Sequence, residues 1–209
     1  MNKLAALMAC PLILILAGCN STPTTTVTEA PKPIEPVTGQ SALYKMYQVA
    51  RSAWSPDAQV LTCTSLHLAE VPQVPGKAGA WQATFTSETL GRKRPYSYSV
   101  VESTDVHKDV FAGPEESWSG KQGVESSFTI QAVSIDTNAA YKTALEQAGD
   151  YDKKNPGMNI AFVLEKTSKF PDPAWRVVWG ESVGTSNFSI YVDSSTGAFL
   201  AKIDRKSVV

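Results

Sequence analysis

Two helix patterns, each followed by strand patterns, constrain the fold of this chain more than any other feature of its sequence. Residues 41–54 (SALYKMYQVARSAW) and 134–149 (SIDTNAAYKTALEQAG) place apolar side chains at the spacing of a helix that buries one face. The apolar positions are Ala42, Leu43, Met46, Tyr47, Ala50 and Trp54 in the first segment and Ala140, Tyr141, Ala144, Leu145 and Ala148 in the second. Each of these faces requires an apolar surface to pack against.

Segments with a strand-like alternation follow each helix pattern and provide that surface. In AWQATFTSE, residues 80–88, Trp81, Ala83 and Phe85 fall on one face and polar side chains on the other. The other strand segments are 59–71 and 96–103 after the first helix, and 158–166, 170–182 and 187–204 after the second. The sequence therefore predicts an α+β fold with two helix-on-antiparallel-sheet halves.

The two halves also share short sequence matches in the same order. ALYK at 42–45 matches AAYK at 139–142, AW at 80–81 matches AW at 174–175, and Tyr98 falls level with Tyr191. We interpret this order as a tandem duplication. It divides the folded region into a first half, residues 40–134, and a second half, residues 135–209, and segment 105–133 is expected to add strands to the sheet.

The N-terminus has the pattern of an export signal. Lys3 precedes an apolar run from Leu4 to Ala17, which is shorter than the roughly 20 residues that span a bilayer. The sequence Leu16-Ala17-Gly18-Cys19 resembles the lipobox of bacterial lipoproteins. The resemblance implies that residues 1–18 are removed and that Cys19 then carries lipid chains, which anchor the protein in a membrane. The alternative is an ordinary signal peptide whose cleavage site happens to precede a cysteine.

The residues that follow Cys19 indicate where the protein is held. Asn20 stands where the lipoprotein family's signal for retention in the inner membrane is Asp, so we expect the outer membrane and a periplasm-facing protein. Residues 19–39 are rich in Thr and Pro, which predicts a disordered, extended tether. After removal of residues 1–18, 18 basic and 20 acidic residues leave a net charge of −2. This near balance gives no reason to expect a nucleic-acid partner.

Cysteine and histidine are too scarce to suggest metal or redox chemistry. With Cys10 removed and Cys19 lipidated, Cys63 is the remaining cysteine, and its strand-like surroundings predict a buried thiol. The alternative is an intermolecular disulfide or a reactive thiol. The two histidines, His67 and His107, stand far apart in sequence. We therefore expect no metal site and no cofactor.

The stretch 193–197, DSSTG, raises the question of a catalytic group. Asp193 precedes two serines, Thr196 and Gly197, between two apolar strands. Asp side chains stabilise turns, and Gly suits a hairpin with a bulge, so we interpret this stretch as an exposed hairpin tip. A nucleophilic serine needs a base. We therefore expect no enzyme, and the alternative is a hydrolase in which His67 or His107 acts from a distant part of the chain.

The second half resembles PepSY-like domains from Asp136 to Asp204. The residues that carry the resemblance are Asp136-Thr137-Asn138-Ala139-Ala140, Trp175-Arg176-Val177 and Val192-Asp193-Ser194-Ser195-Thr196-Gly197. The resemblance implies a helix packed on a small antiparallel sheet, no catalytic residues, and association with the cell envelope, where a role in binding or inhibiting peptidases has been proposed for this family.

We therefore expect a lipid-anchored module that binds an envelope protein or peptide, with exposed sheet edges open to strand addition. Trp118 lies in a polar stretch and is the expected partner contact. Trp81, Trp175 and Trp179 are expected in the core, the basic run 91–95 in a hairpin loop, and Glu115 and Glu116 in a solvated loop. A second alternative is a small-ligand carrier that uses a concave sheet face.

Overall fold

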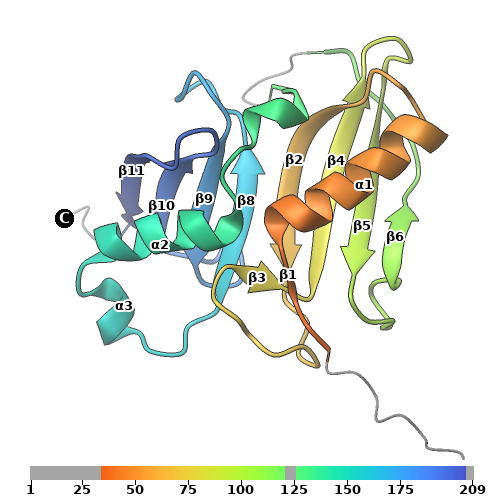
Figure 1. The fold of residues 1–209 in the computed structure, drawn as a ribbon. Helices are drawn as coiled ribbons and strands as arrows, with labels where there is room; N and C mark the ends of the chain where they lie inside the picture. Colours follow the sequence, from red (N-terminus) through yellow and green to blue (C-terminus); the bar gives the residue numbers. More distant parts are fainter. Residues whose placement is uncertain (1–33, 121–125, 206–209) are drawn as a thin grey trace, which may run out of the picture. The chain divides into compact units, whose positions relative to one another are not determined.

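The computed structural model describes residues 34–120 and 126–205 (Figure 1). The expected signal peptide, Cys19 and most of the expected tether lie outside the described residues. The helical elements are α1 (Gly39–Ala53), the 3-10 turn η1 (Ile130–Ala132), α2 (Thr137–Ala148) and α3 (Tyr151–Lys154). None of the helices in these two ranges is long and apolar enough to cross a membrane.

Within the described residues eleven strands accompany the helices, and nine of them form one antiparallel sheet. The strands are β1 (Val37–Thr38), β2 (Gln59–Leu66), β3 (Lys77–Ala78), β4 (Ala80–Ser87), β5 (Arg92–Ser99), β6 (Asp109–Ala112), β7 (Glu116–Ser117), β8 (Ile160–Glu165), β9 (Ala174–Trp179), β10 (Phe188–Asp193) and β11 (Phe199–Asp204). In the sheet they follow the order β11-β10-β9-β8-β2-β4-β5-β6, and β7 pairs with β5. The predicted α+β class is therefore confirmed, and segment 105–133 does add strands.

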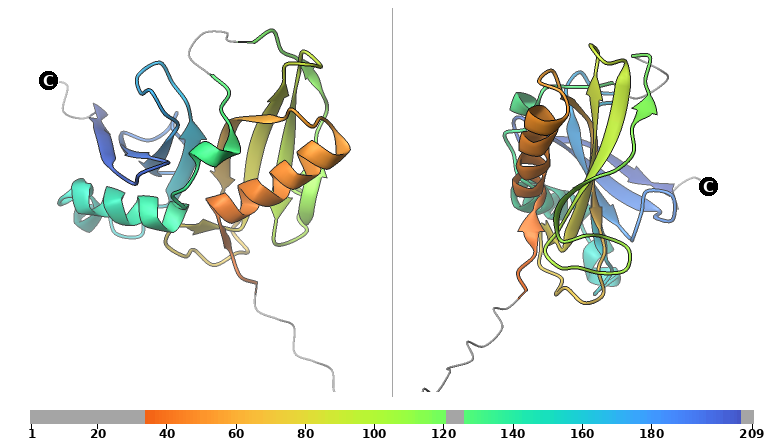
Figure 2. Two further views of the ribbon diagram at one scale, coloured as in Figure 1. Left: turned by 45° about the horizontal axis from the view of Figure 1, so that its top comes forward. Right: turned by 90° about the vertical axis from the view of Figure 1, so that its right-hand side faces the viewer.

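Both long helices cover the same face of this sheet (Figure 2). Helix α1 packs on β2, β4 and β5, and α2 packs on β9, β10 and β11. In each half a helix with one apolar face is thus followed in the chain by the strands that it covers. This arrangement confirms the predicted packing of helices on an antiparallel sheet.

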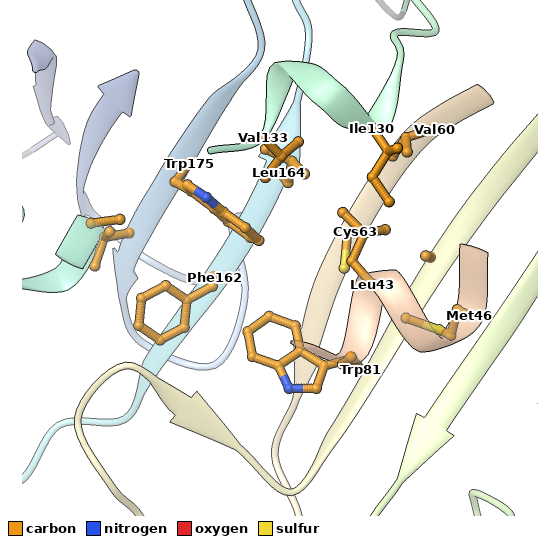
Figure 3. Close-up of a cluster of buried hydrophobic side chains, with 14 of the residues drawn as sticks. Leu43, Met46, Val60, Cys63, Trp81, Ile130, Val133, Phe162, Leu164 and Trp175 are labelled. Atoms are coloured by element: carbon orange, nitrogen blue, oxygen red, sulfur yellow. The ribbon is translucent and has the colours of Figure 1, made fainter. Parts of the chain in front are cut away.

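The two halves join through their first strands. Strands β2 and β8 pair antiparallel, with Thr62 opposite Glu165, Cys63 opposite Leu164, and Thr64 opposite Val163. Because equivalent strands meet in opposite directions, an approximate two-fold axis runs through this junction. The halves therefore share one continuous sheet, and one cluster of buried side chains extends across both (Figure 3).

Equivalent residues of the two halves make equivalent contacts. The indole N–H of Trp81 donates to the carbonyl oxygen of Val37 at 3.1 Å, and that of Trp175 donates to Ile135 at 2.8 Å. Each bond ties a strand to the residue that lies two positions before a helix. The two rings also meet edge to face, with centroids 6.3 Å apart. The predicted burial of both tryptophans, and of Trp179, is confirmed.

The register of the strands corrects two of the predicted sequence matches by one residue. Trp81 stands opposite Tyr98 on β5, whereas Trp175 stands opposite Val192 on β10. The counterpart of Tyr98 is therefore Val192, and Tyr191 points to the opposite face of the sheet. The buried helix positions Ala42, Met46 and Ala50 correspond to Ala140, Ala144 and Ala148, which are 98 residues later. The alignment of ALYK with AAYK, at an offset of 97, is accordingly one residue out of phase.

Candidate functional site

The hairpin tip 193–197 holds itself together through its own polar groups. The Asp193 carboxylate accepts hydrogen bonds from the backbone N–H groups of Ser195 and Thr196, both at 2.8 Å, and from the Ser195 hydroxyl at 2.7 Å. These bonds hold the pKa of Asp193 below its ordinary value, although partial burial acts in the opposite direction. Gly197 adopts a φ of 77°, as expected of glycine in a bulged hairpin.

Ser194 differs from the expectation of an exposed tip, because it is fully buried. Its hydroxyl donates to the carbonyl oxygens of Ala132 at 3.0 Å and Pro173 at 2.8 Å, and its own carbonyl accepts from Ser134 and Ile135. The hairpin is thereby joined to the segment that leads into α2. The Ser194 hydroxyl thus holds backbone segments together.

The two histidines make contacts elsewhere in the described structure. His107 Nδ1 lies 2.8 Å from a carboxylate oxygen of Glu102, and its ring packs on Phe111 with centroids 4.5 Å apart. His67 is exposed and lies just past the end of β2. The hydrogen bonds of Asp193, Ser194 and Ser195 involve neither imidazole.

The basic run and the acidic pair lie together rather than in separate loops. Residues 92–94 begin β5 and are not a hairpin loop, and β7 pairs beside them. Lys93 lies 3.2 Å from Glu116 and Arg94 lies 3.8 Å from Glu115, so each acidic residue has a cation partner. Trp118 follows directly, and it is half-buried, with its backbone N–H bonded to Gly91. The expected partner contact at Trp118 stays a prediction.

A cleft of about 310 Å³ opens between the two halves, where β2 ends and β8 begins. Pockets that hold small ligands begin at about this size. The cleft is lined by residues 65–68, 71–79, 155–162 and 180–181, together with Tyr141 and Asp152. In Figure 1 the relevant ends of β2 and β8 lie beside β3.

The cleft exists because the pairing of β2 with β8 stops early. The register covers Thr62 to Thr64 on β2, although β2 continues to Leu66. At the next position the Ser65 hydroxyl, and not a backbone carbonyl, accepts the Phe162 N–H at 2.9 Å. Beyond this bond residues of both strands line the cleft.

Acidic and hydroxyl groups line the part of the cleft next to α2 and α3. One carboxylate oxygen of Asp152 accepts the Trp179 indole N–H at 2.9 Å. Burial raises the pKa of the Tyr141 hydroxyl, and the charge of Asp152 raises it further. Tyr141 therefore stays protonated at neutral pH and can donate a hydrogen bond. At the rim, Glu181 contributes a second carboxylate and Lys77 a cation.

A side-chain bridge spans the mouth of the cleft. The Gln73 amide nitrogen donates to the Asn159 side-chain oxygen, and the Asn159 nitrogen donates to Glu181 at 3.4 Å. Gln73 is exposed and lies in the segment PQVP, residues 72–75, all of which is exposed. The bridge connects the loop of the first half to the start of β8 in the second.

Sequence reasoning places Tyr141 on the apolar face of a helix and treats the two segments that line the cleft as turns. The sequence signal for these two segments is the Gly and Pro content of VPGKAG, which follows a strand in the first half, and of KKNPG, which follows a helix in the second. Within residues 34–120 and 126–205, no group of His, Cys, Asp and Glu is placed to hold a metal ion.

Comparisons with known proteins give little further guidance. No family model matches the chain, and no curated protein matches it. A solved structure from Clostridium difficile 630, whose description assigns it provisionally to the lipoproteins, covers 77% of this chain and 91% of its own, with 10% identity and a TM-score of 0.45. A likeness at this level carries no argument about function.

Proposed function

We propose that this protein is a lipid-anchored, non-catalytic binding protein of the cell envelope and that it holds an envelope protein or peptide in the cleft between its two halves. The observation that carries the proposal is the cleft itself, which has the volume of a ligand site and polar groups on apolar walls. Its groups come from both halves, so a ligand there contacts both.

The anchor part of the proposal rests on the lipobox at Leu16–Cys19 and on the Thr/Pro-rich tether. The tether was expected to run to residue 39, but Val37–Thr38 form β1 and Gly39 begins α1, so it ends before Val37. Lipid chains on Cys19 would hold the N-terminus at the membrane, and the tether would let the folded body reach partners some distance away. Asn20 favours the outer membrane over the inner membrane.

Mass spectrometry of the N-terminal peptide from purified membranes tests the anchor. We expect an acylated Cys19 as the first residue, and no lipid mass after Cys19→Ser. The variant Asn20→Asp should move the protein to the inner-membrane fraction. An unmodified N-terminus at any other residue would remove the lipoprotein assignment without affecting the cleft.

Binding is favoured over hydrolysis because the hydroxyl groups most suggestive of catalysis are used in the fold. Ser194 donates to two backbone carbonyls, and Ser195 donates to Asp193. The double variant His67→Ala/His107→Ala separates the two classes. We expect binding of the cellular partner to persist, whereas a hydrolase that uses either imidazole as its base would lose its activity.

The PepSY-like resemblance enters the proposal through the shared geometry of the halves. The two indole bonds and the equal helix spacing favour a tandem pair of such domains, with residues 40–134 as the first and 135–209 as the second. Modulation of a peptidase is the role that the family suggests. The cleft offers a place where a segment of that enzyme could be held.

Site-specific photo-crosslinking in intact cells tests the binding function. A photoreactive amino acid replaces Met158 at the rim of the cleft, and another replaces Leu145 on the outer side of α2, where the exposure is similar at 36% and 39%. We expect a specific adduct from position 158 and none from 145. A third probe replaces Trp118. Equal labelling from positions 158 and 145, or an adduct from position 118 alone, would contradict binding in the cleft.

A further inference from the structure

We propose that the ligand of this cleft is an extended peptide segment with a Lys or Arg side chain, which adds as a strand to the open start of β8. This inference rests on the proposed binding function and names the class of ligand. It depends on the direction of the β8 backbone, on the charges in the cleft, and on the form of its walls.

The backbone of β8 presents unpaired groups to the cleft. The Phe162 N–H points toward β2, because it donates to the Ser65 hydroxyl at 2.9 Å. The carbonyl of Asn159 points the other way, toward β9, since it accepts the Gly180 N–H at 2.7 Å. Backbone directions alternate along a strand. The N–H and C=O of Ile160 therefore point into the cleft, where β2 no longer pairs.

An extended peptide provides the groups that this edge lacks. Its carbonyl and N–H can pair with Ile160 in the manner of strand addition, which satisfies main-chain groups without any change of the sheet. The open part of β8, Ile160 and Ala161, spans about 7 Å at 3.3 Å per residue, because the Phe162 N–H is already bonded to Ser65. The ligand is accordingly a short segment.

The charges of the cleft favour a cation on this segment. Asp152 uses one carboxylate oxygen for the Trp179 indole, and its second oxygen accepts no hydrogen bond in the described contacts. Glu181 adds negative charge at the mouth, where Lys77 is the opposing cation. A Lys or Arg side chain that reaches Asp152 would form a charge-assisted hydrogen bond. The neutral Tyr141 hydroxyl beside it can also bind the segment.

The remaining walls of the cleft can pack along the aliphatic stem of a ligand side chain, and a side-chain bridge crosses the entrance. Val74 and Met158 are each 36% exposed and line the cleft, so they can pack along a peptide or a lysine stem. The exposed bridge between Gln73 and Asn159 crosses the mouth. Its opening costs one surface hydrogen bond, which a bound backbone can replace.

Nuclear magnetic resonance titration of the mature chain, residues 19–209 with Cys19→Ser, tests the proposal with four probes. They are acetyl-Ala-Lys-Ala-amide, the same peptide with N-methylated backbone amides, acetyl-Ala-Glu-Ala-amide, and acetyl-lysine-amide. We expect saturable shifts of the Ile160 and Phe162 amides with the first probe alone, and slower hydrogen exchange of the Ile160 amide when that probe is bound.

The variant Asp152→Asn tests the charge, because an asparagine oxygen can still accept the Trp179 indole. We expect it to weaken binding of the lysine peptide by about tenfold, whereas Asp105→Asn, which removes an exposed carboxylate elsewhere, should change affinity by less than about twofold. Retained binding in the first variant would overturn the role of Asp152.

The other outcomes separate this inference from the proposed function. Equal binding of the N-methylated peptide or of acetyl-lysine-amide would overturn strand addition, and equal binding of the glutamate peptide would overturn the preference for a cation. If no probe shifts the cleft while position 158 still crosslinks a partner in cells, the cleft binds but its ligand class is different. If both fail, the binding function itself is wrong.

Discussion

At the scale of single residues, polar side chains in this protein fix the backbone at the ends of strands. Asp57 accepts hydrogen bonds from the Ser55 and Ser87 hydroxyls at 2.6 and 2.7 Å and from the Thr89 N–H at 3.0 Å. It thereby joins the turn after α1 to the hairpin between β4 and β5. Asp193 and Ser194 act similarly in the hairpin between β10 and β11.

The variant Asp57→Asn should lower the free energy of unfolding by about 1–2 kcal/mol at pH 7. It replaces one of the two acceptor oxygens with an NH2 donor, which cannot accept the Thr89 N–H. The Ser55 bond and the Thr89 N–H hold the pKa of Asp57 far below its ordinary 3.8. The stability that the Asp57 carboxylate contributes is therefore fully present above pH 3.8, and it is lost as the pH falls below 3.8.

Urea unfolding at pH 7 and pH 3 measures both effects. The wild type should lose more stability on acidification than Asp57→Asn does, while Asp105→Asn should follow the wild type. Equal acid sensitivity of wild type and Asp57→Asn would show that this carboxylate makes no difference to the folded state.

The variant Ser194→Ala should lower the free energy of unfolding by about 1–3 kcal/mol, because it removes a buried hydroxyl from the Ala132 and Pro173 carbonyls. Thr196→Ala, at the exposed tip of the same hairpin, should cost less than about 0.5 kcal/mol. Thermal denaturation of both variants checks this. Equal small losses would mean that the tip is exposed throughout, as the sequence had suggested.

At the scale of elements, local patterns predict what forms but not how it pairs. Both long helices, the hairpin at 187–204 and the buried faces of the Trp strands follow from periodicity, because each depends on residues close in sequence. The burial of Ser194 and the pairing of β2 with β8 join residues about 60 and 100 positions apart. No local pattern contains that information, so the cleft was not predicted.

The start of α1 lies at the approximate two-fold axis and tolerates no side chain. The Gly39 N–H donates to the Thr137 hydroxyl at 2.9 Å, which joins the first residues of the two helices. A Cβ atom at Gly39 would lie 2.7 Å from Thr137, 2.8 Å from Trp175 and 2.9 Å from Trp81. These are ring and methyl atoms inside a packed core, so they have little room to move.

The variant Gly39→Ala should therefore cost about 1–3 kcal/mol, despite the better helix propensity of alanine. Gly184→Ala is the matched control, because its Cβ atom would have one neighbour, at 3.9 Å. Differential scanning calorimetry should show a lower Tm for the first variant and an unchanged one for the second. A stabilised Gly39→Ala protein would mean that the helices separate more easily than the structure indicates.

At the scale of the whole molecule, the two halves of the described chain share the nine-stranded sheet and the larger of two clusters of buried side chains. Strands β2 and β8 contribute Cys63 and Leu164 opposite each other, and both side chains are fully buried. Cys63 is a free cysteine, and burial raises the pKa of its thiol well above the ordinary value. The thiol is therefore protonated and unreactive in the folded protein.

The variant Leu164→Ala should lower the free energy of unfolding by about 2–5 kcal/mol, because it leaves a cavity at this junction. Unfolding should remain a single transition, with the amides of α1 and α2 losing protection from hydrogen exchange together. Two separate transitions, with protection lost in α2 alone, would indicate that the halves fold independently.

The most direct test of the central claim measures, in living cells, whether crosslinking in the cleft depends on the charge of Asp152. A photoreactive amino acid at position 158 is compared in the wild-type background, in Asp152→Asn and in Asp105→Asn. If the cleft holds a cationic peptide segment of an envelope partner, the yield of the adduct should fall severalfold in Asp152→Asn and stay unchanged in Asp105→Asn. An undiminished adduct in Asp152→Asn, at equal protein level, would contradict the account.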